Sequence, residues 1–217
     1  MKPRKDAIEN ATWENLDITE DEVDHISRRN DRAFIKFKKR IKDSDQFKLE
    51  GNVFDNATYA ALYKLVQEGH LSALGGPISS GKEAIVFEAY GAEGREVAVK
   101  IYLINSSAFR QMKEYLTGDP RFHGISSDKK DIVIAWTRKE FANLTRAMSA
   151  GVRVPEPIAV KRNVLVMELI GTENNIAKKL QTVNLENPDV AYQIIKDFMR
   201  KLHLSGLVHG DLSEYNI

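Results

Sequence analysis

The residues best suited to chemistry lie in the run Val208-His209-Gly210-Asp211-Leu212-Ser213-Glu214-Tyr215-Asn216. An aspartate followed by four residues and an asparagine has the spacing of a catalytic loop for phosphoryl transfer. In such a loop the carboxylate orients the proton of the attacking hydroxyl, and the amide oxygen binds a magnesium ion. Asp211 is therefore the candidate catalytic base and Asn216 the candidate metal ligand. A polar turn at a helix end is the alternative interpretation.

A lysine and a glutamate upstream form a second candidate group. Lys100 ends the apolar run Val97-Ala98-Val99, and Glu140 lies in Trp136-Thr137-Arg138-Lys139-Glu140-Phe141, on a predicted helix. In protein kinases such a lysine binds the phosphates of the nucleotide and pairs with a helix glutamate. Taken alone, Lys100 also fits a strand-end lysine that extends to solvent, and Glu140 an ordinary helix glutamate. Their order along the chain favours the pair.

Two further segments have residues that suit a nucleotide. In Ser79-Ser80-Gly81-Lys82-Glu83-Ala84, hydroxyls, a flexible glycine and a lysine precede a predicted strand and can surround a phosphate chain. The spacing is not that of a Walker A motif, and such turns are common. The largely apolar segment Val164–Gly171, which ends in Met167-Glu168-Leu169-Ile170-Gly171, is typical of a strand that leads into an adenine-binding hinge. A buried strand with its turn is the alternative.

Apolar spacing predicts the elements that must position these residues. We expect an order of helix, hairpin, helix, hairpin, helix, which indicates an α+β domain built on an antiparallel sheet. The predicted helices are Asp55 to Gly69, Ile132 to Ser149 and Pro188 to Leu204, and the predicted strands are 84–89, 96–102, 157–161 and 163–169.

The connecting segments are predicted from their turn residues. Gly75-Gly76-Pro77 is expected to break the chain, residues 103–131 to be irregular, and residues 171–184 to be partly helical. In the last helix, the side chains expected to point inward are Val190, Ile194, Ile195, Phe198, Met199 and Leu202.

Composition limits the class of protein. The 217 residues carry 32 Lys and Arg against 31 Asp and Glu, a net charge of +1, so bulk charge indicates no partner. The absence of cysteine excludes disulfides, thiol catalysis and thiolate metal sites. No apolar run is long enough for a signal peptide or a membrane span. We expect a cytoplasmic protein with no membrane partner.

Residues 1–45 form a polar and basic extension. The first 30 residues are expected to be a mobile or weakly helical tail. Residues 28–42 are rich in lysine and arginine, with Phe34, Ile35 and Phe37 between them. This segment is interpreted either as a solvated helix face with a packed apolar side or as a contact to RNA phosphates.

Together the motifs resemble the RIO family of atypical serine/threonine protein kinases, in particular its first subfamily in archaeal form. The resemblance covers about residues 45–217. It is carried by Ser79–Ala84, Val97–Tyr102, Gly118-Asp119-Pro120-Arg121-Phe122, Trp136–Leu144 and His209–Asn216.

This resemblance implies a protein-kinase-like fold of the α+β class. Residues 46–167 would form the N-lobe, an antiparallel sheet with helices and a flexible loop at 103–131. Residues 168–171 would be the hinge, and residues 172–217 only the start of a helical C-lobe, ending in the catalytic loop. The family's second metal-binding aspartate would then lie beyond Ile217, so we expect the chain to be incomplete at its C-terminus.

The resemblance also implies roles for the candidate residues. The ligands would be ATP and Mg²⁺, with Mn²⁺ as a possible substitute. Ser80 and Lys82 would contact the triphosphate, and Lys100, braced by Glu140, would hold it. Backbone groups of Glu168 and Ile170 would bind adenine beside Met167, with Asp211 as the base and Asn216 as a metal ligand.

The implied function is that of an ATP-dependent serine/threonine kinase or ATPase in maturation of the small ribosomal subunit. Its partners would be the precursor of that subunit, with its RNA and protein, and a protein substrate or the chain itself. One alternative is a small-molecule phosphotransferase of the aminoglycoside kinase kind, which also uses His-Gly-Asp with a nearby asparagine. Another is a nucleotide-sensing module that binds ribosomal particles through residues 28–42.

Overall fold

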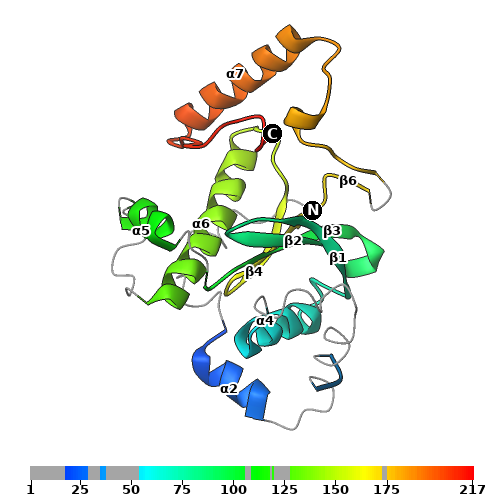
Figure 1. The fold of residues 1–217 in the computed structure, drawn as a ribbon, viewed down its shortest axis with the longest axis vertical. Coiled ribbons are helices and arrows are strands. Elements are labelled where there is room, and N and C mark those ends of the chain that lie inside the picture. Colours follow the sequence, from blue (N-terminus) through cyan, green and yellow to red (C-terminus); the bar gives the residue numbers. More distant parts are fainter. Residues whose placement is uncertain are drawn as a thin grey trace.

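The computed structural model describes residues 18–28, 35–37, 54–105, 109–117, 119, 128–172 and 175–217. In this part of the chain a five-stranded antiparallel sheet has the order β1-β2-β3-β5-β4 (Figure 1). Both predicted hairpins are confirmed, within one residue at each strand end. The strands are β1 (Ala73–Ser80), β2 (Ala84–Tyr90), β3 (Glu96–Tyr102), β4 (Pro157–Lys161) and β5 (Val164–Glu168).

The prediction that Gly75-Gly76-Pro77 breaks the chain is wrong, because these residues lie inside β1. The register with β2 shifts on both sides of Pro77, so the strand contains an irregularity of the β-bulge kind. A Cβ atom on Gly75 would lie 2.5 Å from Cγ of Glu88, and the Gly76 N–H donates to the Glu88 carboxylate at 3.2 Å. Glycine thus allows the two strands to approach closely while the ladder stays interrupted.

One face of the sheet packs against α4 (Asn56–Gln67). The helix begins as predicted, because the Asp55 carboxylate accepts a hydrogen bond of 2.7 Å from the Thr58 N–H. Full burial of each apolar side chain in this layer contributes about 1.5–3 kcal/mol. The buried layer includes Leu62 and Leu65 of the helix and Phe87, Val97, Val99, Ile101, Val164 and Val166 of the sheet.

The opposite face carries α6 (Lys129–Ser149). This helix begins three residues before the predicted Ile132, because Asp128 caps it by accepting from the Lys130 N–H at 2.8 Å. The expectation of an irregular segment at 103–131 is wrong for residues 109–117, which form α5 (Phe109–Thr117). The turn residues around this helix masked its period, but Met112 and Leu116 are buried against the α6 residues Ile132 and Val133.

The N-terminal tail includes a helix, α2 (Glu20–Arg28), that packs on α4. Thr19 and Glu22 form a capping box: the Glu22 N–H donates to the Thr19 hydroxyl at 3.2 Å, and the Thr19 N–H to the Glu22 carboxylate at 3.0 Å. Ile18 and Val23 are buried, so this part of the tail is folded onto the body. Most of the basic segment 28–42 lies outside the described residues.

After β5 the chain forms a two-strand ribbon, β6 (Gly171–Thr172) and β7 (Asn175–Ile176), a short 3-10 helix η5 (Leu180–Thr182), and α7 (Pro188–Leu204). The bounds of α7 are as predicted. The expectation that its apolar residues point inward is wrong for Val190, Ile194 and Met199, which are 53%, 49% and 53% exposed. The helix lies beyond the C-terminal end of α6 (Figure 1), and none of its residues is buried.

Across the described ranges, every helix is too short or too polar to cross a lipid bilayer.

Candidate active site

Lys100 and Glu140 are joined directly, although they come from β3 and α6. The Lys100 ammonium donates two hydrogen bonds of 2.9 Å, one to each carboxylate oxygen of Glu140. The two side chains are 25% and 26% exposed, so the pair lies at the edge of the interior. An ammonium held in this way is a fixed point charge suited to phosphate oxygens.

Tyr102 contacts both members of this pair, and it was not among the candidate site residues identified from the sequence. Its phenol donates to Oε2 of Glu140, and its ring centre lies 4.9 Å from Nζ of Lys100. Tyr102 itself is 2% exposed and packs with α6 residues, including Val133. Because strand side chains alternate with a period of two, Tyr102 had to share the face of Lys100, and this spacing was the available signal.

Strand register sets the order of the remaining candidates along the sheet. Glu168, the first residue of the predicted hinge, is opposite Val97 at the start of β3. Lys100 is three residues further along β3, about 10 Å away, and the β1–β2 turn follows beyond Tyr102. Lys100 therefore lies between the predicted hinge and the predicted phosphate loop.

Two small apolar residues lie on the same face as Lys100. Val86 is opposite Lys100 in β2, and Ala98 is opposite Met167 in β5. Ala98 is buried, whereas Val86 and Met167 are half-buried. Met167 was predicted to line the base site; Val86 and Ala98 were not singled out, although strand alternation places them beside it.

The predicted phosphate loop is the exposed tip of the β1–β2 hairpin. Ser80 pairs with Ile85, and the Gly81 N–H donates to the Ala84 carbonyl at 3.0 Å, which closes the turn. Ser80 and Lys82 are exposed at this tip. The Glu83 carbonyl accepts from the Leu103 N–H at 2.9 Å, so the turn is fixed to the end of β3.

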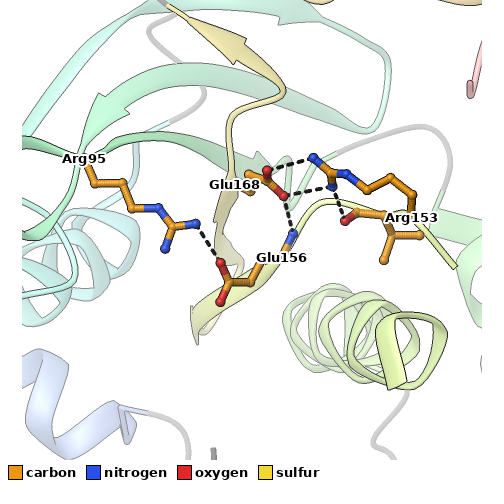
Figure 2. Close-up of polar contacts among 5 residues, drawn as sticks. Arg95, Arg153, Glu156 and Glu168 are labelled. Carbon is orange, nitrogen blue, oxygen red and sulfur yellow. Dashed lines mark hydrogen bonds and ion pairs between the residues drawn. The ribbon is translucent and has the colours of Figure 1, made fainter. Parts of the chain in front are cut away.

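At the predicted hinge, the Glu168 carboxylate is held by three N–H donors (Figure 2). Nη1 and Nη2 of Arg153 donate to Oε2 and Oε1 of Glu168 at 2.9 and 2.8 Å, and the Glu156 N–H donates to Oε2 at 3.1 Å. Burial acts to raise the pKa of Glu168. The hydrogen bonds from Arg153 and Glu156, with the charges of Arg153 and Arg95, outweigh burial and lower that pKa.

The chain leaves the sheet directly after Glu168. Leu169 is buried and Ile170 is exposed, and the Ile170 carbonyl accepts from the Ala177 N–H at 2.9 Å. Gly171 has φ +108°, and a Cβ atom there would lie 2.5 Å from the Asn175 carbonyl oxygen, so the turn requires glycine. The predicted hinge is therefore a defined turn between β5 and the β6–β7 ribbon.

Asp211 and Asn216 also lie in contact. Nδ2 of Asn216 donates to the Asp211 carbonyl at 2.8 Å, to Oδ2 of Asp211 at 3.1 Å and to the Ser213 hydroxyl at 3.4 Å. The amide nitrogen is thus committed to the loop, which leaves the amide oxygen as the group for a hard cation. Both side chains are exposed.

The segment that carries Asp211 is fixed to the rest of the chain through its backbone. Arg146 of α6 donates to the Ser205 carbonyl at 2.7 Å, and the N–H groups of Leu180 and Gln181 donate to the carbonyls of Ile217 and Glu214 at 2.8 and 3.0 Å.

The candidates form separate groups. No hydrogen bond or ion pair between described residues joins Asp211 or Asn216 to the Lys100–Glu140 pair. Nor do the described ranges contain a cluster of three His, Asp or Glu side chains placed for a metal ion.

Sequence comparison finds similarity to RIO proteins. The family model described as "RIO domain" matches residues 85–217. The chain is 58% identical over 217 residues to the RIO-type serine/threonine-protein kinase Rio1 of Haloferax volcanii, covering 100% of this chain and 75% of that protein. It is 38% identical over 201 residues to the Rio1 kinase of Methanocaldococcus jannaschii, covering 92% of this chain and 68% of that protein.

Structural comparison finds similarity to a kinase. The crystal structure of the Rio2 kinase–ADP/Mg²⁺–phosphoaspartate complex from Chaetomium thermophilum matches with a TM-score of 0.58 and 26% identity. The match covers 76% of this chain and 46% of that one. The predicted α+β, protein-kinase-like fold is confirmed.

Proposed function

The chain belongs to the RIO kinase family, and we propose that it uses ATP to phosphorylate serine or threonine hydroxyls of proteins, itself included, or hydrolyses ATP in the same site. The observation that carries the proposal is the Lys100–Glu140 pair, with both hydrogen bonds at 2.9 Å. A lysine that is held by a glutamate and lies between a hinge and a hairpin tip is placed for the phosphates of a nucleotide.

The remaining residues take roles along an extended nucleotide. The base would lie near Ala98 and Met167 and meet backbone groups of Glu168 and Ile170. The phosphates would lie at Lys100 and reach Ser80 and Lys82 at the hairpin tip. Charge stabilisation by fixed donors is the main contribution that a protein makes to phosphoryl transfer.

Asp211 would accept the proton of the attacking hydroxyl. Asn216 would keep the Asp211 carboxylate in place through its hydrogen bond of 3.1 Å. Mg²⁺, or Mn²⁺ in its place, would be held by the amide oxygen of Asn216. When bound, such an ion neutralises charge on the phosphates. The Rio2 kinase that this chain resembles was solved with ADP and Mg²⁺, which supports the proposal.

The proposed setting is the cytoplasm, in maturation of the small ribosomal subunit. The partner would be the precursor particle, bound through its RNA and protein. The support is the clustered lysine and arginine in residues 28–42, which suits RNA phosphates.

Mg²⁺-dependent ATP hydrolysis and transfer of labelled phosphate to protein test this function. We expect Asp211→Ala to lower turnover by a factor on the order of 100 or more while the Kd for ATP stays within threefold, because the base acts in the transition state. Glu186→Ala, which removes an exposed carboxylate outside the loop, is the matched control. Turnover that survives Asp211→Ala would show that the base is assigned wrongly.

The acceptor distinguishes the proposal from its alternatives. Efficient transfer to a sugar or antibiotic hydroxyl, without transfer to protein, would favour a small-molecule phosphotransferase. ATP binding without turnover, together with binding to small-subunit particles, would favour a nucleotide-sensing module.

A further inference from the structure

We propose that Arg153 is a positioning residue for the nucleotide, which sets the orientation of the hinge backbone by clamping the carboxylate of Glu168. The inference rests on the proposed function, because it takes residues 168–170 as the segment that meets the base. Arg153 follows α6 and lies in none of the motifs that identify the site.

Glu168 is fixed through both its side chain and its backbone (Figure 2). Its carboxylate receives the two-pronged contact from Arg153, at 2.9 and 2.8 Å. Its N–H donates to the Glu156 carbonyl at 2.9 Å, while the Glu156 N–H returns a bond of 3.1 Å to the carboxylate. A residue held at four points has little freedom to turn, and Glu168 is the first residue of the predicted hinge.

The guanidinium group of Arg153 is itself held in place. Its Nη1 also donates to the Val154 carbonyl at 2.7 Å, so the guanidinium is fixed against its own backbone as well as against Glu168. Arg95, from the β2–β3 turn, donates to the Glu156 carboxylate at 2.6 Å (Figure 2). This contact holds the segment that follows Arg153 and carries Glu156. Planar guanidinium groups give such pairs a defined direction.

Exposure indicates that this cluster acts on geometry more than on stability. The side chain of Arg153 is 57% exposed, and those of Arg95 and Glu156 are 50% and 48% exposed. Ion pairs in solvent add little to the free energy of unfolding, whereas a two-pronged contact still fixes orientation. The cluster is therefore suited to align the hinge without being required for folding.

The clamp also links the hinge to the helix that carries Glu140. Val152 is buried, and its N–H donates to the Ala147 carbonyl at 3.0 Å, so the chain turns directly from the end of α6 into Arg153. Arg153 then reaches Glu168 at the end of β5. The hinge segment that begins at Glu168 and the helix that carries Glu140 are thus linked through Arg153.

Titration of the purified chain with ATP, together with steady-state kinetics, tests the role of Arg153. We expect Arg153→Leu to raise the Kd and KM for ATP by about fivefold, with kcat at saturating ATP within twofold, because alignment of the base affects binding equally in the ground and transition states. Arg153→Lys keeps the positive charge but cannot make the two-pronged contact with Glu168. Its Kd for ATP should therefore lie between those of Arg153→Leu and the unmodified chain.

A double-mutant cycle shows whether Arg153 acts through Glu168. Glu168→Gln alone should weaken ATP binding, and addition of Arg153→Leu should change the Kd by less than about twofold more. Arg200→Leu, which removes an exposed arginine of α7, is the control and should leave the Kd unchanged.

The outcomes separate this inference from the function on which it rests. If the unmodified chain does not bind ATP, the proposed function fails. If it binds ATP and neither Arg153 variant changes the Kd, or if the effects of Arg153→Leu and Glu168→Gln multiply, the positioning role is overturned. Thermal melting of each variant distinguishes loss of the fold from loss of alignment, and Arg153→Lys decides the question if Arg153→Leu does not fold.

Discussion

Lys100 and Glu140, 40 positions apart in the chain, meet through two hydrogen bonds of 2.9 Å, one to each oxygen of the carboxylate. The contact joins the third strand of the sheet to α6, so the relative placement of these two elements determines whether the ammonium is held. Tyr102, which donates to the same carboxylate, keeps Glu140 directed toward the sheet.

Removal of the ammonium should abolish most of the activity. We expect Lys100→Met to lower kcat/KM for ATP on the order of 100-fold, because a preorganised charge at the phosphates is lost. Glu140→Gln should act in the same direction with a smaller loss, since Lys100 keeps a partner without charge. Lys130→Met, at an exposed position of α6, is the control for loss of a lysine. Retention of kcat/KM within threefold in Lys100→Met would contradict the assignment.

Tyr102→Phe removes one hydroxyl and leaves the aromatic ring beside Lys100. Because the phenol donates to a charged, half-buried carboxylate, we expect unfolding to become easier by about 1–2 kcal/mol. Glu140 would also lose one of its two restraints, so kcat/KM should fall several-fold. Urea unfolding and ATP turnover measure the two effects. Tyr192→Phe, at a 60% exposed position of α7, should change neither.

The hairpins of this fold could be predicted because their strands alternate and contain β-branched residues. Residues 96–102 are a strand in both the prediction and the structure. The same rule failed at Gly75-Gly76-Pro77, because a bulge keeps the strand in the sheet while glycine and proline give the composition of a turn. Apolar spacing located α7 but could not show that its apolar face would be exposed.

The candidate site could be predicted only where the chain carries a motif. Lys100 and Glu140 were singled out by the order of their motifs, and Asp211 by its spacing to Asn216. Arg153 had no local signal, because its partner Glu168 lies 15 positions away and meets it only when α6 and β5 are packed together. The spacing of Tyr102 from Lys100 placed both side chains on one face of β3. The contact of its hydroxyl with Glu140 could not be predicted, because it depends on how α6 packs on the sheet.

A buried asparagine connects the site to the core. Asn163, 1% exposed, donates to the Thr58 hydroxyl at 3.0 Å and to the Tyr102 carbonyl at 2.9 Å. We expect Asn163→Leu to lower the free energy of unfolding by about 3 kcal/mol, because both acceptors lose a buried donor. Urea unfolding checks this value. Asn184→Leu, at an exposed position, is the control and should stay within about 0.5 kcal/mol.

The Glu168 cluster should make stability depend on pH in acid. Burial acts to raise the pKa of Glu168, but the Arg153 and Glu156 hydrogen bonds and the positive charges nearby hold it below its usual value of 4.5. A carboxyl whose pKa is lower in the folded than in the unfolded chain stabilises the fold above the unfolded pKa, and this stabilisation is lost as pH falls through the folded pKa.

The measurement compares urea unfolding of the unmodified chain and of Glu168→Gln across a pH series. The difference in unfolding free energy should be constant from about pH 8 to about pH 5.5 and should shrink below 4.5. A difference that grows on acidification would have the wrong sign for this cluster.

The basic segment leads to a prediction that salt can test. If residues 28–42 contact RNA phosphates, log affinity for single-stranded RNA should fall linearly with log salt, by about 0.7 for each phosphate neutralised. Replacement of Lys36, Lys38 and Lys39 by glutamate should weaken binding and reduce that slope by about 2, since about three contacts are lost. The same replacement at Lys130, Lys178 and Lys196, which lie outside the segment, is the control for net charge. An affinity that does not respond to salt would leave the solvated helix face as the correct interpretation of the segment.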